Sequence, residues 1–294
     1  NFQRGFTVAC IHNKIEIMKF LFEKGIDDIQ EGFYRACENG HFKIVKFLFK
    51  KGVEKNFEEE FIIASYNGHF DIVEFLFERG AKNLEEAFKS ACQNGHFSVV
   101  KFLIEKNYCI YEYKRRSKTN KFCDMGFYYA CKKAHIRIVN FLIEKGFARF
   151  NIGFIVACKK GNKKIVNILI EKKTNNPYYD FTACKYMNDF LSAIFKMDFI
   201  DNHKGFIVAC KKGRKKIVNL LIDKIENDIY VINKGFAAAC KGGHIKIVKL
   251  LIEKGADAFI RGFIMARDND HHEIVELLDD KIKNKNICLL ELID

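Results

Sequence analysis

The sequence predicts an all-α fold, an elongated solenoid of stacked helix-turn-helix repeats with shortened hairpin loops. Three observations support this prediction. A phrase close to G-F-x-x-A-C-K-x-G-H-x-K-I-V-x-F-L-I-E-K-G occurs ten times in 294 residues, its alanine never fails, and a phenylalanine lies three residues before it in nine copies. Repetition at a period of about 20–50 residues is typical of solenoids, in which each unit packs against its neighbours. The alanines are Ala9, Ala36, Ala64, Ala91, Ala130, Ala157, Ala183, Ala209, Ala239 and Ala266.

Each copy is expected to begin with a short helix that is apolar on one side. In the sixth copy Phe154, Ala157 and Cys158 lie at positions i, i+3 and i+4, which share one stripe of a helix. We expect this stripe to face the core. The alanine is expected where neighbouring helices approach most closely, because native packing density leaves room there for little more than a methyl group.

A turn and a second, longer helix are expected to follow. Gly161 and Asn162 interrupt the first helix, and residues 165–170 then form a broad apolar face. The second helix is expected to end at a slot whose residues readily adopt the left-handed conformation. That slot holds Gly25, Gly52, Gly80, Gly146 and Gly255, with Asn107 in a sixth copy.

The copies resemble the ankyrin repeat. The resemblance is carried by ACENGHFKIVKFLFKKG from Ala36, ASYNGHFDIVEFLFERG from Ala64 and ACKGGHIKIVKLLIEKGAD from Ala239, and it extends over nearly the whole chain. Two features depart from the family pattern. Gly-Phe stands where the family has Thr-Pro-Leu-His, and the period is about six residues shorter than the family's 33. The resemblance therefore implies stacked helical hairpins whose projecting β-hairpin fingers are reduced to turns.

We expect one continuous solenoid with four segments. Repeats 1–4 occupy residues 1–106, a basic insertion loop 107–125, repeats 5–10 residues 126–282, and a C-terminal tail or cap 283–294. The seventh copy, at residues 182–197, matches worst, and either a bend or ordinary sequence drift explains it.

The first copy lacks a polar outer face. Ile11, Ile15, Ile17 and Met18 are as apolar as the residues of inner copies. Terminal repeats of a solenoid ordinarily carry a polar outer face. We therefore expect the natural protein to extend further at its N-terminus.

Positive charge is concentrated in the middle of the chain. Residues 108–222 carry 24 Lys and Arg against 8 Asp and Glu, a net of +16, whereas residues 1–107 and 223–294 have net charges of −1 and −2. Such a block raises the local concentration of acidic ligands. The alternative is a solvated lysine-rich face that serves solubility alone.

Candidate binding residues follow from the ankyrin resemblance, which implies that the two positions after Ala-Cys point into a concave groove and vary with the partner. In the middle copies these positions become lysines. Tyr128 and the basic insertion extend the same surface. The candidate partner-binding residues are Lys132, Lys133, Lys159, Lys160, Lys185, Tyr186, Lys211, Lys212, Tyr128, Arg115 and Arg116.

Two functions remain open at this level. One is a non-catalytic scaffold or adaptor that binds a protein, plausibly an acidic one, along the concave face. The other is RNA or DNA binding through the basic central groove, in which tyrosines would stack on bases. The sequence contains no P-loop, G-x-S-x-G or H-E-x-x-H motif, so we expect no enzyme and no cofactor.

Eight of the eleven cysteines occupy the slot after the repeated alanine. We expect them to be buried thiols in a reducing intracellular compartment, the cytoplasm or the nucleus, because equivalent points in successive repeats lie about 10 Å apart, too far for disulfides. The Cys-x-x-x-His spacing is not expected to bind metal, because the histidine should cap the turn and hydrogen-bond the next repeat. No stretch of about 18 apolar residues suggests a membrane span.

Overall fold

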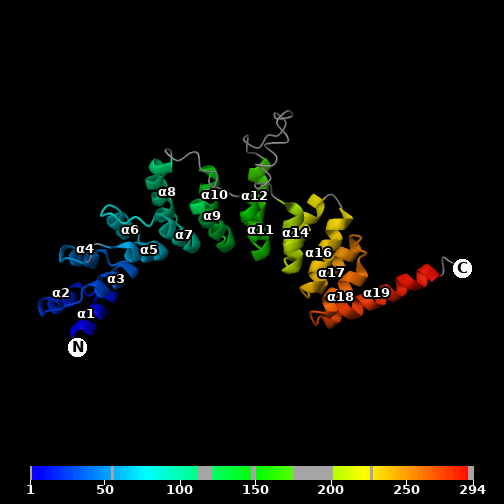
Figure 1. Cartoon of the computed structure of the whole chain (residues 1–294), viewed down its shortest axis with the longest axis horizontal. Helices are drawn as coiled ribbons and strands as arrows, with labels where there is room; N and C mark the ends of the chain where they lie inside the picture. The colour runs from blue at the N-terminus through cyan, green and yellow to red at the C-terminus, as the bar shows by residue number, and fades with distance from the viewer. Residues whose placement is uncertain are drawn as a thin grey trace, which may run out of the picture. The chain divides into compact units, whose positions relative to one another are not determined.

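The computed structural model describes residues 2–53, 56–111, 121–146, 150–174, 201–225 and 228–290. Within these ranges the chain is helical, with turns between the helices and no strand, which confirms the all-α prediction. The chain divides into two compact units, residues 1–148 (unit 1) and 149–294 (unit 2). The colours of Figure 1 follow the helices of each unit in chain order.

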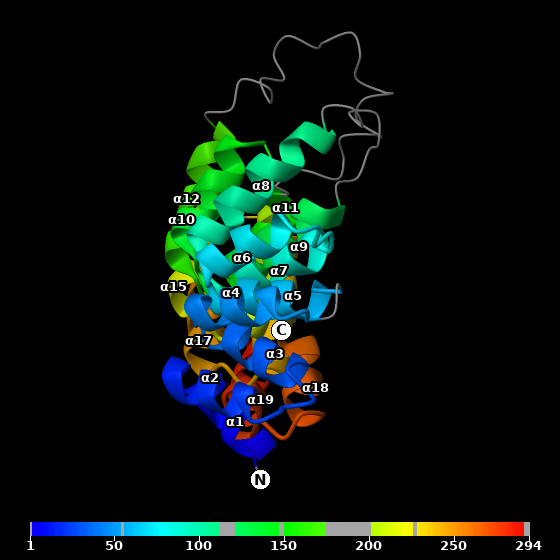
Figure 2. The same ribbon diagram turned by 90° about the vertical axis from the view of Figure 1, so that its left-hand side faces the viewer.

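Unit 1 consists of five helical hairpins. The first helices of the hairpins pack in a row, each on the next, and the second helices form a parallel row beside them. In Figure 2 the second helices α2, α4, α6 and α10 lie to the left of their first-helix partners. The helices are α1 (Phe2–Ile11), α2 (Ile15–Glu23), α3 (Gln30–Glu38), α4 (Phe42–Lys50), α5 (Glu58–Asn67), α6 (Phe70–Phe77), α7 (Leu84–Asn94), α8 (Phe97–Tyr111), α9 (Lys121–Lys133) and α10 (Ile136–Glu144).

Unit 2 repeats the same arrangement. The first helices α11, α14, α16 and α18 pack successively, and the second helices α12, α15, α17 and α19 lie beside them. Their bounds are α11 (Phe150–Lys160), α12 (Lys163–Thr174), α14 (Asn202–Lys211), α15 (Lys215–Ile222), a 3-10 turn (Asp223–Ile225), α16 (Ile229–Lys241), α17 (Ile245–Glu253), α18 (Phe259–Arg267) and α19 (His272–Leu290). That the two units form one continuous solenoid stays a prediction.

The predicted core slots are buried in both units. Phe154, Ala157 and Cys158 are all fully inaccessible to solvent, as are the equivalent residues of most other copies. The phenylalanine also explains why glycine precedes it. A Cβ atom on Gly32 would lie 2.5 Å from the ring of Phe6 in the preceding hairpin, so a side chain there would displace that ring. Where glycine occupies this slot, it leaves room for the ring of the preceding hairpin; Glu60 and Ala87 occupy the slot in the third and fourth hairpins.

The glycine slot after the second helix behaves as predicted where glycine occupies it. Gly25, Gly52, Gly80, Gly146 and Gly255 all have positive φ, between 75° and 104°. The prediction for Asn107 is wrong, because α8 continues through it to Tyr111. The range expected to be an insertion loop, 107–125, is therefore helical at both ends, since α9 begins at Lys121.

The histidine after the turn contacts the preceding repeat, not the next one as the sequence suggested. His41 Nε2 donates to the carbonyl oxygen of Ile11 at 2.7 Å, and His69 Nε2 donates to that of Glu38 at 2.9 Å. Neither ring caps its own helix. The same bond joins His96 to Tyr66, His135 to Gln93, His244 to Lys211 and His271 to Lys241. These bonds link successive hairpins along the turns.

Hairpins six and eight are direct neighbours in unit 2. α11 packs on α14, and a Cβ on Gly205 would meet the ring of Phe154, as in other successive pairs. Arg214 occupies the histidine slot, and its Nε donates to the carbonyl oxygen of Lys159 at 3.2 Å. The interpretations of the seventh copy concern residues outside the described ranges.

Candidate partner-binding surface

The candidate lysines lie at the C-terminal ends of first helices, in the turn before the second helix. Lys159 and Lys160 end α11, Lys211 ends α14, and Lys212 follows it; all four side chains are exposed. Cations at a helix C-terminus are favoured by the partial negative charge of the last carbonyl groups. Their position alone is thus compatible with a purely structural role.

The structure adds five basic residues that the sequence interpretation did not single out. Lys163 and Lys164 open α12, and Lys215 and Lys216 open α15, directly after the lysines at the first-helix ends. Arg214 is the N-cap residue of α15 and lies between Lys212 and Lys215 in the sequence. The sequence signal was visible in KKGNKK and KKGRKK. We call the nine exposed residues the basic turn cluster, and its members are Lys159, Lys160, Lys163, Lys164, Lys211, Lys212, Arg214, Lys215 and Lys216.

The two halves of the cluster come from distant parts of the sequence. Lys159 and Lys211 are 52 positions apart, yet their helices α11 and α14 are in contact and Arg214 bonds to the Lys159 carbonyl. None of the nine side chains forms a salt bridge with another residue of the described ranges. The cluster therefore concentrates positive charge that the described part of the protein does not neutralise.

The described candidate residues of unit 1 form a smaller group on α9. Tyr128 and Tyr129 meet edge to face with ring centroids 5.2 Å apart, and Lys132 Nζ lies 5.5 Å and 5.3 Å from the two rings. Lys133 is exposed. Two of the candidate residues, Tyr128 and Lys132, are therefore in cation–π contact. The remaining candidates, Arg115, Arg116, Lys185 and Tyr186, lie outside the described residues.

The equivalent turn positions in the early hairpins of unit 1 are neutral or acidic and are held by internal bonds. Asn67 Nδ2 donates to the Glu38 carbonyl oxygen at 2.9 Å, and Arg35 pairs with Glu38 at 2.9 Å. The basic surface is therefore absent from these hairpins.

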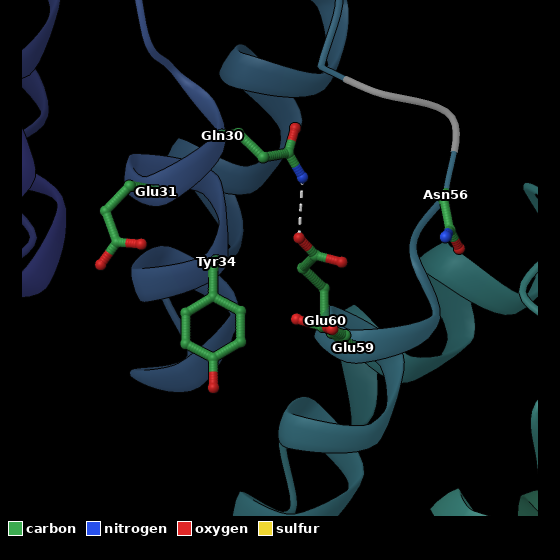
Figure 3. A pocket seen from close by; sticks show the side chains of 6 residues that line it. All are labelled: Gln30, Glu31, Tyr34, Asn56, Glu59 and Glu60. Carbon is green, nitrogen blue, oxygen red and sulfur yellow. Dashed lines mark hydrogen bonds between the residues drawn. The ribbon is translucent and has the colours of Figure 1, made fainter.

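An acidic hollow of about 340 Å³ lies nearby, between α3 and α5. Figure 3 shows Gln30 of α3 reaching toward Glu60 of α5, and its Nε2 donates to Glu60 Oε1 at 2.8 Å. Burial raises the pKa of Tyr34, and the carboxylate of Glu38 raises it further. The lining residues are Gln30, Glu31, Tyr34, Asn56, Glu59 and Glu60. The hollow has the opposite charge to the basic turn cluster.

The cysteine and histidine pairs are arranged for packing. Burial raises the pKa of the Cys158 thiol to about 12, so the thiol stays neutral. The described histidines of the turns use Nε2 to donate to a carbonyl. No group of three or more His, Cys, Asp or Glu side chains in the described ranges is arranged so that it could hold a metal ion. No helix there is long and apolar enough to cross a membrane.

Family models for ankyrin repeats match most of the sequence. A model of three copies matches residues 61–152, 91–178 and 127–262, and a model of many copies matches residues 6–49 and 33–77. The chain belongs to the ankyrin-repeat family. Ankyrin repeats generally mediate protein–protein interactions and are typically non-catalytic.

The crystal structure of the human ASB11 ankyrin repeat domain aligns with a TM-score of 0.48 and 20% sequence identity, over 57% of this ankyrin-repeat chain and 82% of the ASB11 chain. A comparison with curated proteins gives no match.

Proposed function

We propose that this ankyrin-repeat protein is a non-catalytic scaffold or adaptor that binds an acidic segment of another protein at the basic turn cluster. One observation carries the proposal. Lys163, Lys164, Lys215 and Lys216 occupy the first turns of α12 and α15, where the exposed N–H groups make cations unfavourable. The nine cations form no salt bridge with the described part of the chain, and they repel one another. The helix-end position and the mutual repulsion of these lysines both lower the stability of the folded protein. An anionic partner that neutralises the positive charge would offset both effects.

The surroundings of the cluster favour a protein over a nucleic acid. Single-stranded nucleic acids bind through a basic groove combined with aromatic rings on which bases stack. In residues 150–174 and 201–225 the aromatic side chains are Phe150, Phe154 and Phe206, and all three are buried. Tyr128, the ring proposed for stacking in unit 1, already packs against Tyr129 and Lys132.

A reducing intracellular location fits the same proposal. Eight cysteines are free and buried, namely Cys10, Cys37, Cys92, Cys123, Cys131, Cys158, Cys210 and Cys240. Burial raises the pKa of Cys10 and Cys240 to about 12, which keeps both thiols neutral. Thiols packed in this way are typical of proteins that fold where disulfides do not form.

The test compares two charge reversals of equal size. Lys159→Glu with Lys160→Glu alters the cluster, whereas Lys249→Glu with Lys254→Glu alters exposed lysines of α17 and its C-cap outside it. Each variant and the intact chain are used to capture partners at physiological salt, and bound proteins are identified by mass spectrometry. We expect a specific acidic protein to be lost with the first variant and kept with the second. Identical partners for all three chains would refute the proposal.

The nucleic-acid alternative is tested by measuring RNA binding with the same protein variants. A labelled single-stranded RNA oligonucleotide should bind weakly to the intact chain at about 0.15 M salt, because non-specific contacts to phosphates release counterions and weaken steeply with salt. Tight RNA binding that persists at this salt and falls with Tyr128→Ala would favour the alternative instead.

A further inference from the structure

The two turns of the basic turn cluster are joined by Arg214. Its Nε donates to the carbonyl oxygen of Lys159 at 3.2 Å, and its Cδ would lie 3.0 Å from a Cβ atom on Gly161. The guanidinium group therefore lies against the preceding turn. Its two Nη groups have no hydrogen-bond partner among the described residues, so they can donate to a ligand.

Histidine takes the place of this arginine in the two following hairpins of unit 2. His244 and His271 occupy the same slot, and each uses Nε2 to donate to a carbonyl oxygen of the preceding turn. Histidine makes this bond without carrying a permanent charge at neutral pH. Arg214 makes the bond and also places a permanent cation between two groups of lysines.

The acidic residues in the described parts of these two hairpins lie away from the turns. They are Glu171, Asp201 and Asp223. Glu171 and Asp223 each follow the nearest cluster lysine by seven positions (164 to 171 and 216 to 223), which is about 10 Å at 1.5 Å per residue. Asp201 is the N-cap of α14, and the cluster lysine of that helix lies at its C-terminal end. These carboxylates are therefore too distant to form salt bridges with the cluster.

The two turns are spaced to suit an extended chain that crosses them. α11 packs on α14, and the axes of packed helices are about 8–10 Å apart. A segment in the polyproline II conformation has three residues per turn and advances about 3.1 Å per residue, so every third side chain points the same way at intervals of about 9 Å. Such a segment directs one side chain toward each of the two turns.

The charge of the turns exceeds what one carboxylate per turn can balance. The first turn carries four cations and the second five, whereas the turn of the next hairpin, residues 241–246, carries two. A carboxylate supplies one negative charge, but a phosphorylated side chain supplies about 1.5 to 2 and three acceptor oxygens. Lysine and arginine both bind phosphate through charge-assisted hydrogen bonds. Phosphate is therefore the better match to each turn.

We infer that the acidic segment bound at the basic turn cluster is phosphorylated, with two phosphorylated side chains three residues apart in an extended chain. One phosphate lies among the lysines of the α11–α12 turn, the other lies among those of the α14–α15 turn, and Arg214 lies between them. The inference rests on the proposed function, which specifies only an acidic segment.

Four labelled peptides of one otherwise neutral sequence test the inference. The first has two phosphoserines three residues apart, the second has them adjacent, the third has unmodified serines, and the fourth replaces each phosphoserine of the first with a pair of glutamates. Fluorescence anisotropy at about 0.15 M salt, where the Debye length is about 8 Å, measures each affinity. We expect the first peptide to bind at least about tenfold more tightly than the others, because it alone places a phosphate on each turn.

Charge reversal in either turn should remove this advantage. Lys159→Glu with Lys160→Glu alters the first turn, and Lys211→Glu with Lys212→Glu alters the second. Each variant should bind the first peptide no more tightly than the second peptide. The charge-reversed lysines of α17, the control of the capture experiment, should leave the affinity unchanged. Thermal melts establish that every variant is folded.

A single substitution measures the contribution of Arg214. Arg214→His keeps an Nε2 donor for the Lys159 carbonyl, as His244 does for that of Lys211, but removes the permanent cation at neutral pH. We expect a thermal midpoint close to that of the intact chain and an affinity for the first peptide that is about tenfold lower. Unchanged affinity would overturn the placement of Arg214 between the phosphates.

The outcomes separate this inference from the proposed function. Equal affinity for the first and second peptides would overturn the spacing, and equal affinity for the first and fourth would overturn the preference for phosphate. A single-stranded RNA oligonucleotide of equal charge that binds more tightly than the first peptide would overturn the inference in favour of nucleic acid. If an acidic protein is captured but no peptide binds, the inference alone fails; if no acidic protein is captured either, the proposed function fails with it.

Discussion

Units 1 and 2 are built from the same type of helical hairpin but differ in the residues that lie at its turn. In unit 1 the second helices α4, α6 and α8 begin with Phe42, Phe70 and Phe97, whereas α12 and α15 of unit 2 begin with Lys163 and Lys215 at the same position. The phenylalanines pack edge to face on the next hairpin, as Phe42 does on Phe75 at 5.5 Å. The lysines make no such contact.

This difference separates two kinds of slot. Positions such as Phe61 and Phe206 are identical in both units, because every hairpin needs them to stack. Positions at the turn edge can contribute packing, as in unit 1, or charge, as in unit 2. The hairpins of α12 and α15 have lysine in place of a packing ring at this position, which is why we interpret the basic turn cluster as a binding surface.

The largest expected effect tests whether the shared slots are equivalent. Phe61→Ala in unit 1 and Phe206→Ala in unit 2 should each destabilise the protein by about 3–5 kcal/mol, because each removes a fully buried ring from the interface between hairpins. Urea denaturation followed by circular dichroism measures both. A small effect in one unit alone would show that this phenylalanine slot is not equivalent in the two units.

A smaller effect is expected from exchanging the slots that differ. Phe42→Lys should cost about 0.5–1.5 kcal/mol for the lost ring pair with Phe75, in addition to its buried area. Lys215→Phe should stabilise unit 2 by a smaller amount, because a ring there can pack on α17. Urea midpoints of the two variants give the comparison. Equal midpoints for Phe42→Lys and the intact chain would mean that the aromatic contacts contribute nothing.

A still smaller effect separates stability from binding within the cluster. Lys163→Glu with Lys164→Glu should stabilise the protein by about 0.3–1 kcal/mol, because anions are favoured in the first turn of α12. The same variant should lose the acidic partner. A rise in the urea midpoint together with loss of capture is the expected result. If capture were unaffected, the solvated-face alternative would account for these lysines.

The smallest effect concerns pH and distinguishes histidine turns from the arginine turn. Burial lowers the pKa of His96, the bond to the Tyr66 carbonyl raises it, and His69 and His135 lower it again, with a net decrease. A pKa lower in the folded than in the unfolded state means that folding favours the neutral ring. The stability from His96 is therefore present above about pH 6.5, the ordinary histidine pKa, and declines as pH falls below it.

His96→Arg copies the solution seen at Arg214 and should remove this part of the pH dependence. Thermal midpoints measured from about pH 7.5 to about pH 5, a range that spans the ordinary histidine pKa, give the size of this dependence. An unchanged slope for the variant would exclude His96 as the titrating group.

The hairpin architecture was predictable because its signals are local. Phe154, Ala157 and Cys158 mark the buried stripe of a first helix, and Gly146 marks the end of a second one, whatever the neighbours do. Asn107 was mispredicted because asparagine tolerates both a helix and a left-handed stop, and local sequence does not choose between them. The cluster was half predicted: its first-helix lysines were identified, but Lys163 and Lys215 were not.

Contacts between hairpins could not be derived in the same way. The sequence places the Lys159 and Lys211 turns two copies apart, yet α11 packs on α14 and Arg214 bonds to the Lys159 carbonyl. The direction of the histidine bonds and the reason for Gly32 likewise depend on which hairpin lies against which. Residue order therefore specifies the repeating unit, because periodicity and turn chemistry act over a few positions. The composition of the basic surface emerges only when the hairpins pack, because it depends on atoms far apart along the chain.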